Sequence, residues 1–334
     1  MYILNPLYYI YKKEYRKTLI AISKKISDRY NVSVLRVIGD MVWCAVRYGA
    51  MWTEYDDLDF FVRSKRNRET YITTFFNFRL YNKLNNKDYR DIFHEKTIFL
   101  EKFKKYIKRF WIDINRSSYA EIKDFLSSHN TVVAKASHGD SGKEVQVIEN
   151  LREKNLDSII SYLKKNNLNL IEEQIVNCDE VRALNNSSLN TLRIVTVKKN
   201  DNIKLLFAGI RIGGKNAKID NISQGGRVAR INISTGKIDS LFYSKKSSNG
   251  SYETGADELN AIGFQIPHYD KVIDVVKNAA MLVPEIRIVA WDVAITPTDI
   301  ELVEGNESFG SVIMQLFYNS RETGLKPRLM EFIK

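Results

Sequence analysis

The chain has 334 residues with 51 lysines and arginines against 40 aspartates and glutamates, which gives a formal net charge of +11. Its 44% hydrophobic and 27% charged residues are typical of a globular protein, and its length suffices for two or three compact domains. The positive charge favours anionic partners such as nucleotides, sugar phosphates, nucleic acid or an acidic membrane surface, without choosing among them.

Several protein classes are disfavoured by the sequence. No apolar run reaches the length of about 18 residues that a transmembrane helix needs, and residues 1–6 lack a signal-peptide pattern. Cys44 and Cys178 lack metal-ligand spacing, which argues against a disulfide framework and a zinc site. No nucleic-acid-binding motif is found, so we expect no nucleic-acid partner. We expect a cytoplasmic protein, with peripheral contact to the inner face of the membrane as an alternative.

Residues 1–95 are rich in tyrosine, lysine and arginine, and they are expected to form a largely helical region that selects the substrate or a partner. Leu19, Ile22 and Ile26 recur at helical spacing, with lysines between them. One interpretation is a helix docked on the core with a solvated basic face. The alternative is a helix that lies on a membrane surface or against a partner protein.

From about residue 96 onward, strand and helix patterns follow one another, which predicts an α+β fold. Helices are predicted over 154–166 and 269–282. Strands are predicted over the ranges 131–135, 145–148, 168–176, 189–198, 203–211, 226–233 and 287–296.

The first candidate binding segment is Lys135 and the loop that follows its strand. Glycines in such a loop let several backbone N–H groups approach a phosphate, and the adjacent lysine can neutralise the charge. The loop residues concerned are Gly139, Ser141 and Gly142. The lysine precedes the glycines, so this is not a P-loop. An ordinary hairpin is the alternative.

The second candidate segment, Leu170–Val176, is an apolar strand that carries Glu172 and Glu173. It could be an interdomain hinge whose backbone pairs with an adenine edge, while an acid holds a ribose hydroxyl. An edge strand with solvated acids is the alternative.

The third candidate segment is a hairpin over 291–306. If its turn is centred on Thr298, Asp292 lies directly opposite Glu304, and Glu304 and Asn306 point to the same face because strand side chains alternate. Two carboxylates and an amide oxygen then converge, and such hard oxygen ligands suit Mg²⁺. The alternative is a hairpin with its polar residues in solvent.

The order Lys96, Lys135, glycine loop, acidic hinge and acidic hairpin resembles the ATP-grasp superfamily. The closer resemblance is to sugar-transfer-associated ATP-grasp proteins of polysaccharide gene clusters. It covers residues 90–320 and is carried by the segments 190–196, 211–214, 220–226, 291–295 and 304–306. The resemblance implies an ATP-grasp fold in which two α+β subdomains grip ATP. Residues 96–175 would form the small subdomain, and residues 176–334 would form the large one with the metal site.

The resemblance also implies roles for individual residues. Contacts to ATP are expected from Lys96, Lys135, Gly139, Ser141, Gly142, Glu172, Glu173, Gln174, Ile175 and Glu180. Asp292, Glu304 and Asn306 would hold Mg²⁺, with two ions expected and Mn²⁺ as an alternative metal.

The remaining roles concern catalysis and the substrate. Amide ligases of the superfamily carry an arginine where this chain has Ala290, so Arg193 or Arg211 is expected to stabilise the transferring phosphoryl group. The expected substrate-side residues are Asn221, Gly225, Gly226 and Arg227, for which a tight turn is the alternative.

The activity implied by the resemblance is that of an ADP-forming carboxylate–amine ligase working through an acyl phosphate. It would modify a sugar or an amino acid in the biosynthesis of a capsule or another cell-surface polysaccharide. Its partners would be an anionic or sugar-linked carboxylate and an amine acceptor. An ATP-grasp kinase is one alternative, and a non-catalytic nucleotide-binding scaffold that contacts a glycosyltransferase is another.

Overall fold

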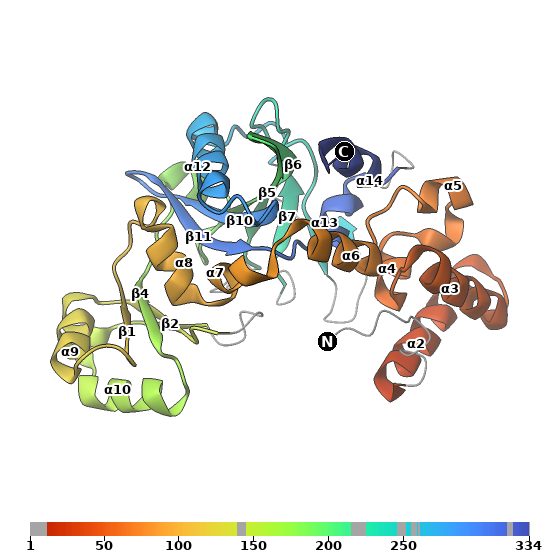
Figure 1. Ribbon diagram of the computed structural model, residues 1–334. Coiled ribbons are helices and arrows are strands. Elements are labelled where there is room, and N and C mark those ends of the chain that lie inside the picture. Colours follow the sequence, from red (N-terminus) through yellow and green to blue (C-terminus); the bar gives the residue numbers. More distant parts are fainter. Residues whose placement is uncertain are drawn as a thin grey trace.

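The fold is taken from a computed structural model that describes residues 12–138, 145–214, 225–245, 252–254, 259, 261–318 and 323–333. Two antiparallel sheets and a helical N-terminal region follow one another across the molecule (Figure 1). Gly139, Ser141, Gly142 and Asn221, which were predicted to contact ligands, lie outside the described residues.

The N-terminal region is helical, as predicted. Helix α2 (Lys13–Tyr30) buries Leu19, Ile22 and Ile26, the residues that recur at helical spacing, against α3 (Val34–Tyr48) and α4 (Trp52–Asp57). The shorter helices that follow are η1 (Phe60–Val62), α5 (Lys65–Arg68), α6 (Thr74–Leu84), η2 (Lys87–Tyr89), α7 (Asp91–His94), α8 (Lys96–Lys102) and η3 (Lys104–Tyr106). No helix among the described residues is both long enough and apolar enough to cross a membrane.

The smaller sheet has four strands in the order β1-β4-β2-β3, and every neighbouring pair is antiparallel. Its strands are β1 (Trp111–Asp113), β2 (Val132–Lys135), β3 (Gln146–Ile148) and β4 (Leu170–Glu173). Helices α9 (Tyr119–Ser128) and α10 (Leu156–Lys165) pack on it through an apolar cluster that includes Ile122, Leu126, Ile160 and Leu163. Helix α9 begins with a capping box in which Ser118 and Glu121 satisfy each other's backbone N–H groups.

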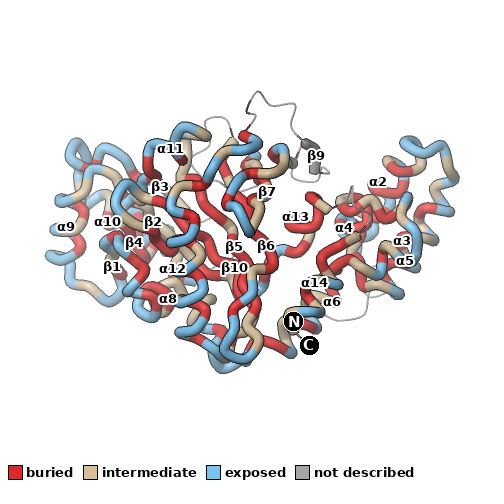
Figure 2. Tube along the Cα trace, turned by 90° about the horizontal axis from the view of Figure 1, so that it is seen from above, coloured by how far each residue is buried: buried red, intermediate tan, exposed pale blue. Residues whose placement is uncertain are grey.

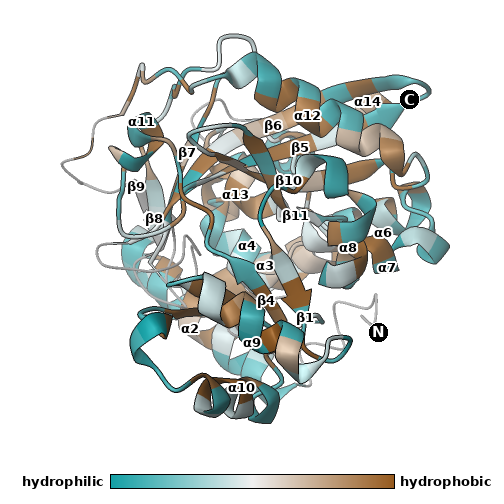
Figure 3. Cartoon of the chain, turned by 90° about the vertical axis from the view of Figure 1, so that its left-hand side faces the viewer, coloured by the Kyte–Doolittle hydropathy of each residue, from teal (hydrophilic) through white to brown (hydrophobic). Residues whose placement is uncertain are grey.

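The larger sheet has seven strands in the order β11-β10-β5-β6-β7-β8-β9, again antiparallel throughout. Its strands are β5 (Thr191–Lys199), β6 (Asn202–Ile212), β7 (Arg227–Arg230), β8 (Tyr243–Lys245), β9 (Tyr252–Thr254), β10 (Ile288–Ile295) and β11 (Ile300–Asn306). Strand β10 is buried along its whole length (Figure 2). Helix α12 (Tyr269–Leu282) covers one face, and hydrophobic and hydrophilic residues alternate along it in Figure 3, as expected for a helix packed on one side.

The hairpin of β10 and β11 has the register that the sequence predicted. Asp292 pairs with Glu304, and a bulge follows between Asp292 and Val293. Gly305 is packed tightly, because a Cβ atom there would lie 2.9 Å from ring carbons of Phe93 and Phe99. The Glu-Gly-Asn sequence therefore combines two polar side chains with a glycine that lets α7 and α8 pack against β11.

Helix α8, which begins at the proposed subdomain boundary at residue 96, packs with the larger sheet. Phe99, Leu100 and Phe103 of the α8 region belong to the apolar core of the larger sheet. The first strand of the smaller sheet begins at Trp111, and Leu170 of β4 belongs to the same core as these residues of the α8 region. The C-terminal helices α13 (Ser311–Leu316) and α14 (Lys326–Ile333) complete a third core together with α6.

Candidate active site

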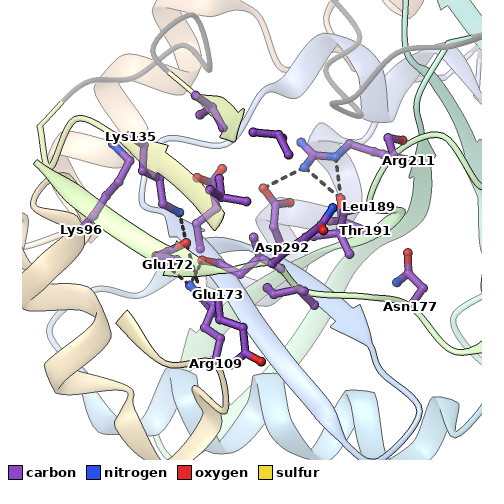
Figure 4. Close-up of a pocket in the computed structure, with 18 of the residues that line it drawn as sticks. Lys96, Arg109, Lys135, Glu172, Glu173, Asn177, Leu189, Thr191, Arg211 and Asp292 are labelled. Atoms are coloured by element: carbon purple, nitrogen blue, oxygen red, sulfur yellow. Dashed lines mark hydrogen bonds and ion pairs between the residues drawn. The ribbon is translucent and has the colours of Figure 1, made fainter. Parts of the chain in front are cut away.

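A cavity of about 700 Å³ lies between the two sheets and receives side chains from both (Figure 4). It is lined on the smaller-sheet side by Lys135, Glu172 and the segment 173–177. On the larger-sheet side it is lined by Thr191, Arg193, Arg211, Asp292, Glu304 and Asn306. Residues far apart in the sequence therefore meet in one volume.

Asp292 is the centre of the charged cluster on the larger sheet. Its carboxylate is fully buried, with Oδ1 2.6 Å from Nε of Arg193 on β5 and Oδ2 3.0 Å from a terminal nitrogen of Arg211 on β6. Arg211 also donates to the hydroxyl of Thr191, at 3.1 and 3.0 Å. Neighbouring strands of one sheet thus hold both guanidinium groups against a single carboxylate.

Glu304 completes this cluster from β11, where it lies opposite Asp292. Burial and the neighbouring Glu304 raise the pKa of Asp292 to about 7, against the lowering effect of the two arginines. Burial acts to raise the pKa of Glu304 too, but its hydrogen bond with Asp292 and both arginines lower it to about 2. The two carboxyl groups therefore share one proton near neutral pH.

The oxygen atoms of this cluster fit a hard divalent cation. Asn306 donates to Glu304 Oε1 at 3.1 Å, which holds the amide beside both carboxyl groups. Asp292 Oδ1 is buried and pairs with Arg193 Nε at 2.6 Å, and a carboxylate oxygen has lone-pair capacity for more than one partner. Among these residues no group of three or more histidine, cysteine, aspartate and glutamate side chains is arranged for a metal. The donors would thus be two carboxylates and one amide.

Lys135 occupies the opposite side of the cavity, where Glu172 holds it. Its Nζ lies 2.6 Å from Glu172 Oε2, and Arg109 Nε lies 3.2 Å from the same oxygen. Burial acts to raise the pKa of Glu172, but Arg109 and Lys135 lower it below its ordinary value. The carboxylate therefore keeps its charge and fixes the lysine ammonium at the cavity wall.

Arg109 also connects the two sheets. Its guanidinium donates to Glu301 Oε1 at 2.7 Å and to the backbone carbonyl oxygens of Leu302 and Val303 on β11 at 2.9 and 3.1 Å. Since the same group is paired with Glu172 on β4, one buried cation joins the smaller sheet to the hairpin of β10 and β11.

The predicted hinge and the second predicted lysine both line the cavity. Lys96 begins α8, and its backbone N–H donates to the carbonyl of Ser137, which lies next to the predicted phosphate loop. Glu173 ends β4 and accepts a hydrogen bond from the Phe110 N–H at 3.1 Å. Gln174 and Ile175 lie just beyond the strand and also face the cavity. Figure 4 shows Lys96 and Lys135 across the cavity from Asp292 and Arg211.

Four residues expected to contact ligands are absent from the cavity lining. Glu180 lies on the exposed first turn of the short helix α11 (Asp179–Arg182) and does not face the cavity, so the ribose contact has no support from its position. Gly225 and Gly226 form a turn, with φ of +89° at Gly225, and Arg227 begins β7 with its guanidinium 5.9 Å from the ring centre of Phe242. None of these three lines the cavity.

Several polar residues that line the cavity had no predicted role, among them His94, Arg109, Arg182 and Thr191. His94 Nε2 lies 2.8 Å from Oε1 of Glu307, which follows β11 directly. Thr191 stands within the segment 190–196 and opposite Arg211, so strand alternation could have identified it. No local pattern marks the other three, because their partners are distant in the sequence.

Solved structures of similar architecture include an ADP complex of purK, an N5-carboxyaminoimidazole ribonucleotide synthetase, with 13% identity and a TM-score of 0.43. That comparison covers 72% of this chain and 51% of the other, so this chain spans about half of its length. The ATP-grasp ligase PsnB with a minimal precursor has 13% identity, coverages of 80% and 70%, and a TM-score of 0.44.

D-alanyl-alanine synthetase A from Vibrio cholerae O1 biovar eltor str. N16961 has 11% identity, coverages of 72% and 60%, and a TM-score of 0.42. We base no conclusion about this chain on scores of that size. A search of curated proteins finds no match.

The family comparison is more extensive. A model of sugar-transfer associated ATP-grasp proteins matches residues 66–334, which include both sheets and every described residue of the cavity named above. The resemblance inferred from the sequence is thereby confirmed, and with it the ATP-grasp fold with a helical N-terminal region. The chain belongs to the sugar-transfer associated ATP-grasp family.

Proposed function

We propose that this chain is an ATP-dependent, ADP-forming carboxylate–amine ligase that modifies a sugar or an amino acid during cell-surface polysaccharide biosynthesis. The observation that carries the proposal is the meeting of Lys135 and Glu172 with Arg193, Arg211, Asp292 and Glu304 in one cavity between two sheets. Family membership supports the assignment of ATP as a substrate, and the charged side chains in the cavity support its assignment as a phosphoryl-transfer site.

The charge balance around Asp292 supports binding of a metal–phosphate pair. Near neutral pH the carboxyl groups of Asp292 and Glu304 hold at most one proton, so with the two guanidinium groups the cluster is neutral or carries one positive charge. A cation can replace the arginines at the carboxylates, and the released arginines can then bind phosphate oxygens bidentately. Ligand binding therefore exchanges one set of ion pairs for another and leaves no buried charge without a partner.

In this proposal the nucleotide binds on the side of the cavity that the smaller sheet lines, across from Asp292 and Glu304. Lys135 and Lys96 are assigned to its phosphates, since both residues line the cavity and the Lys96 N–H donates to the carbonyl oxygen of Ser137, next to the predicted phosphate loop. The adenine is assigned to the segment 173–176, beside apolar side chains such as Val133 and Val147 that also line the cavity. Backbone groups just beyond β4 are free of the sheet ladder there, so they can pair with an adenine edge.

Asp292, Glu304 and Asn306 would hold Mg²⁺, which neutralises charge on the phosphate oxygens when it is bound. The protein residues then perform the positioning. Arg193 and Arg211 stabilise charge on the transferring phosphoryl group, and Lys135 stabilises the nucleotide phosphates.

The proposed reaction has two steps. A carboxylate oxygen of the substrate attacks the γ-phosphorus, a new P–O bond forms, and the bond to the β–γ bridging oxygen breaks, so that ADP leaves. An amine nitrogen then attacks the carbonyl carbon of the acyl phosphate, the C–O bond to phosphate breaks, and the nitrogen loses a proton. The products are an amide, ADP and phosphate. Closure of the two sheets around the cavity would keep water from the acyl phosphate.

The test uses carboxylates labelled with ¹⁸O, incubated with Mg·ATP and an amine. Uronic acids and amino acids serve as the carboxylates, and amino sugars and amino acids as the amines. A ligase transfers one labelled oxygen from the carboxylate to phosphate, and release of that phosphate depends on the amine. A phosphorylated product formed without an amine would show a kinase instead. Absence of turnover with every pair would favour the scaffold alternative and reject the ligase.

A further inference from the structure

A second cavity, of about 890 Å³, lies between the N-terminal helices, α6 and α14. It shares no lining residue with the cavity between the sheets. Its lining combines cationic side chains with aromatic and aliphatic ones. The cationic residues are Arg47, Arg68, Arg79, Lys83, Arg287 and Lys326, and Glu69 is the one carboxylate among the described lining residues.

Two of these cations are already neutralised by carboxylates. Arg47 lies 3.0 Å from Glu69, and Arg68 is held bidentately by Asp40 with both distances 2.8 Å. Four others have no carboxylate within ion-pair distance in the described part of the chain: Arg79, Lys83, Arg287 and Lys326. The cavity therefore carries an excess of positive charge from residues on three different elements.

Lys326 lies close to other cationic side chains of this cavity. It is half-buried at the start of α14, and its ammonium group lies 4.5 Å from the centre of the Phe76 ring. Burial lowers the pKa of Lys326, and the nearby Arg47 and Arg79 lower it further, while Glu69 opposes them. An anion in the cavity would relieve this repulsion.

The remaining walls of the cavity are apolar. They are formed by Phe76, Leu80 and Leu84 on the α6 side and by Met330 and Ile333 on the α14 side. Burial of an apolar ligand group against these walls is favourable, whereas the arginine and lysine side chains bind phosphate oxygens. A simple inorganic anion would use only the cations.

We propose that this second cavity binds an amphiphilic phosphate, that is, a phosphate or diphosphate head joined to an apolar tail. The head lies among Arg79, Lys83, Arg287 and Lys326, and the tail lies against the aromatic and aliphatic side chains of α6 and α14. A cavity of this volume suits a small molecule better than a nucleic-acid strand. The site is independent of the proposed ligase reaction.

The test measures binding of geranyl diphosphate by calorimetry and locates it by lysine acetylation. Arg79→Gln/Lys83→Gln removes two exposed charges from the cavity, and Lys102→Gln/Lys104→Gln removes two exposed charges from elsewhere. We expect at least about tenfold weaker binding in the first variant and unchanged binding in the second. Geranyl diphosphate should also protect Lys83 and Lys326 of the unmodified protein from acetylation, but not Lys102. Equal affinities in all three proteins, or no protection, would overturn the proposal.

Two further ligands test whether the bound molecule must be amphiphilic and whether it comes from a membrane or from solution. Inorganic pyrophosphate should bind about tenfold more weakly than geranyl diphosphate, because it cannot use the apolar walls; equal affinity would overturn the amphiphilic assignment. Phosphatidylcholine vesicles with and without phosphatidic acid identify the source. Co-sedimentation that needs phosphatidic acid, Arg79 and Lys83 supports the proposal with a membrane headgroup as the ligand. Binding of geranyl diphosphate without co-sedimentation supports it with a free molecule as the ligand.

Discussion

Asp292 and Glu304 lie opposite each other on β10 and β11, and the arginines of β5 and β6 approach the same carboxyl groups. Because these four charged groups are so close, we expect turnover to change strongly when one of their charges is removed. Replacing Glu304 by glutamine keeps its size and its contact with Asn306 but removes a negative charge from the metal donors. We expect turnover to fall by at least about a hundredfold with a melting temperature close to that of the unmodified protein.

The control for this prediction is Asp299→Asn. Asp299 lies in the turn of the same hairpin, pairs at the surface with Lys271 and Lys108, and does not line the cavity. Turnover of this variant should stay near that of the unmodified protein. Full activity of Glu304→Gln would remove Glu304 from the metal site.

Glu54 provides a test that concerns stability rather than catalysis. Its carboxyl group is buried, and Oε2 accepts hydrogen bonds from the Met51 and Thr74 N–H groups at 2.9 and 3.0 Å. Burial raises its pKa from 4.5 to about 7 despite these donors. The folded protein therefore binds this proton more tightly than the unfolded chain does. The resulting stabilisation is complete below pH 4.5 and is lost as the pH rises to about 7.

Urea unfolding of the protein and of Glu54→Gln at several pH values measures this effect. Relative to the variant, the unmodified protein should lose on the order of 3 kcal/mol of unfolding free energy between pH 4.5 and pH 7. Glu331→Gln, at an exposed position, should show no such dependence. A constant difference between the protein and Glu54→Gln would show that Glu54 titrates normally in the fold.

The sequence predicted those site residues that follow from a strand period or from a family motif. Asp292, Glu304 and Asn306 converge because alternation and a centred turn determine their faces. The pairing of Lys135 with Glu172, by contrast, depends on the register of β2 against β4, in which Lys135 lies opposite Leu170. Nothing local in the sequence determines that register. Arg109 was not identified for the same reason.

At the scale of elements, Arg109 joins β4 to β11 through two buried carboxylates. Replacing it by methionine removes the cation but leaves Glu172 and Glu301 buried, so their charges lose a partner. We expect a loss of about 3–5 kcal/mol in the free energy of unfolding. Urea denaturation at neutral pH measures it, with Arg116→Met as an exposed control.

The same variant separates two interpretations of Arg109. A loss below about 1 kcal/mol would show that the two sheets are held together without this ion pair. A large loss in Arg109→Met together with a small one in Arg116→Met supports the buried connection, since the ion pairs of Arg116 in the described part of the chain are with exposed Glu101 and with Asp113, both at 3.5 Å.

Long periodic segments were predicted well. The helix predicted over 269–282 has those bounds as α12, and the predicted strands of the larger sheet correspond to β5, β6, β7 and β10. The short strands β1, β8 and β9 were not predicted, since three residues are too few to show a period. Strand β3 is equally short, and it was predicted from the apolar residues Val145, Val147 and Ile148. The strand predicted over 168–176 is shorter in the fold, since β4 ends at Glu173, where the chain turns to the cavity.

At the scale of the whole molecule, the two sheets place complementary groups on opposite walls of one cavity. Lys135 comes from β2 of the smaller sheet, and Asn306 comes from β11 of the larger one. Neither sheet alone presents both the lysine proposed to bind phosphate and the residues proposed to hold Mg²⁺. The proposed activity therefore requires that one nucleotide contact both sheets at once.

The most direct test of this requirement is calorimetric titration with a non-hydrolysable ATP analogue and Mg²⁺. Lys135→Ala on the smaller sheet and Asn306→Ala on the larger sheet should each weaken binding at least about tenfold, and Lys102→Ala should leave it unchanged. Chelation of Mg²⁺ should weaken binding to the unmodified protein and abolish the difference caused by Asn306→Ala. Equal affinities of the unmodified protein and either cavity variant in the presence of Mg²⁺ would contradict a nucleotide held between the two sheets.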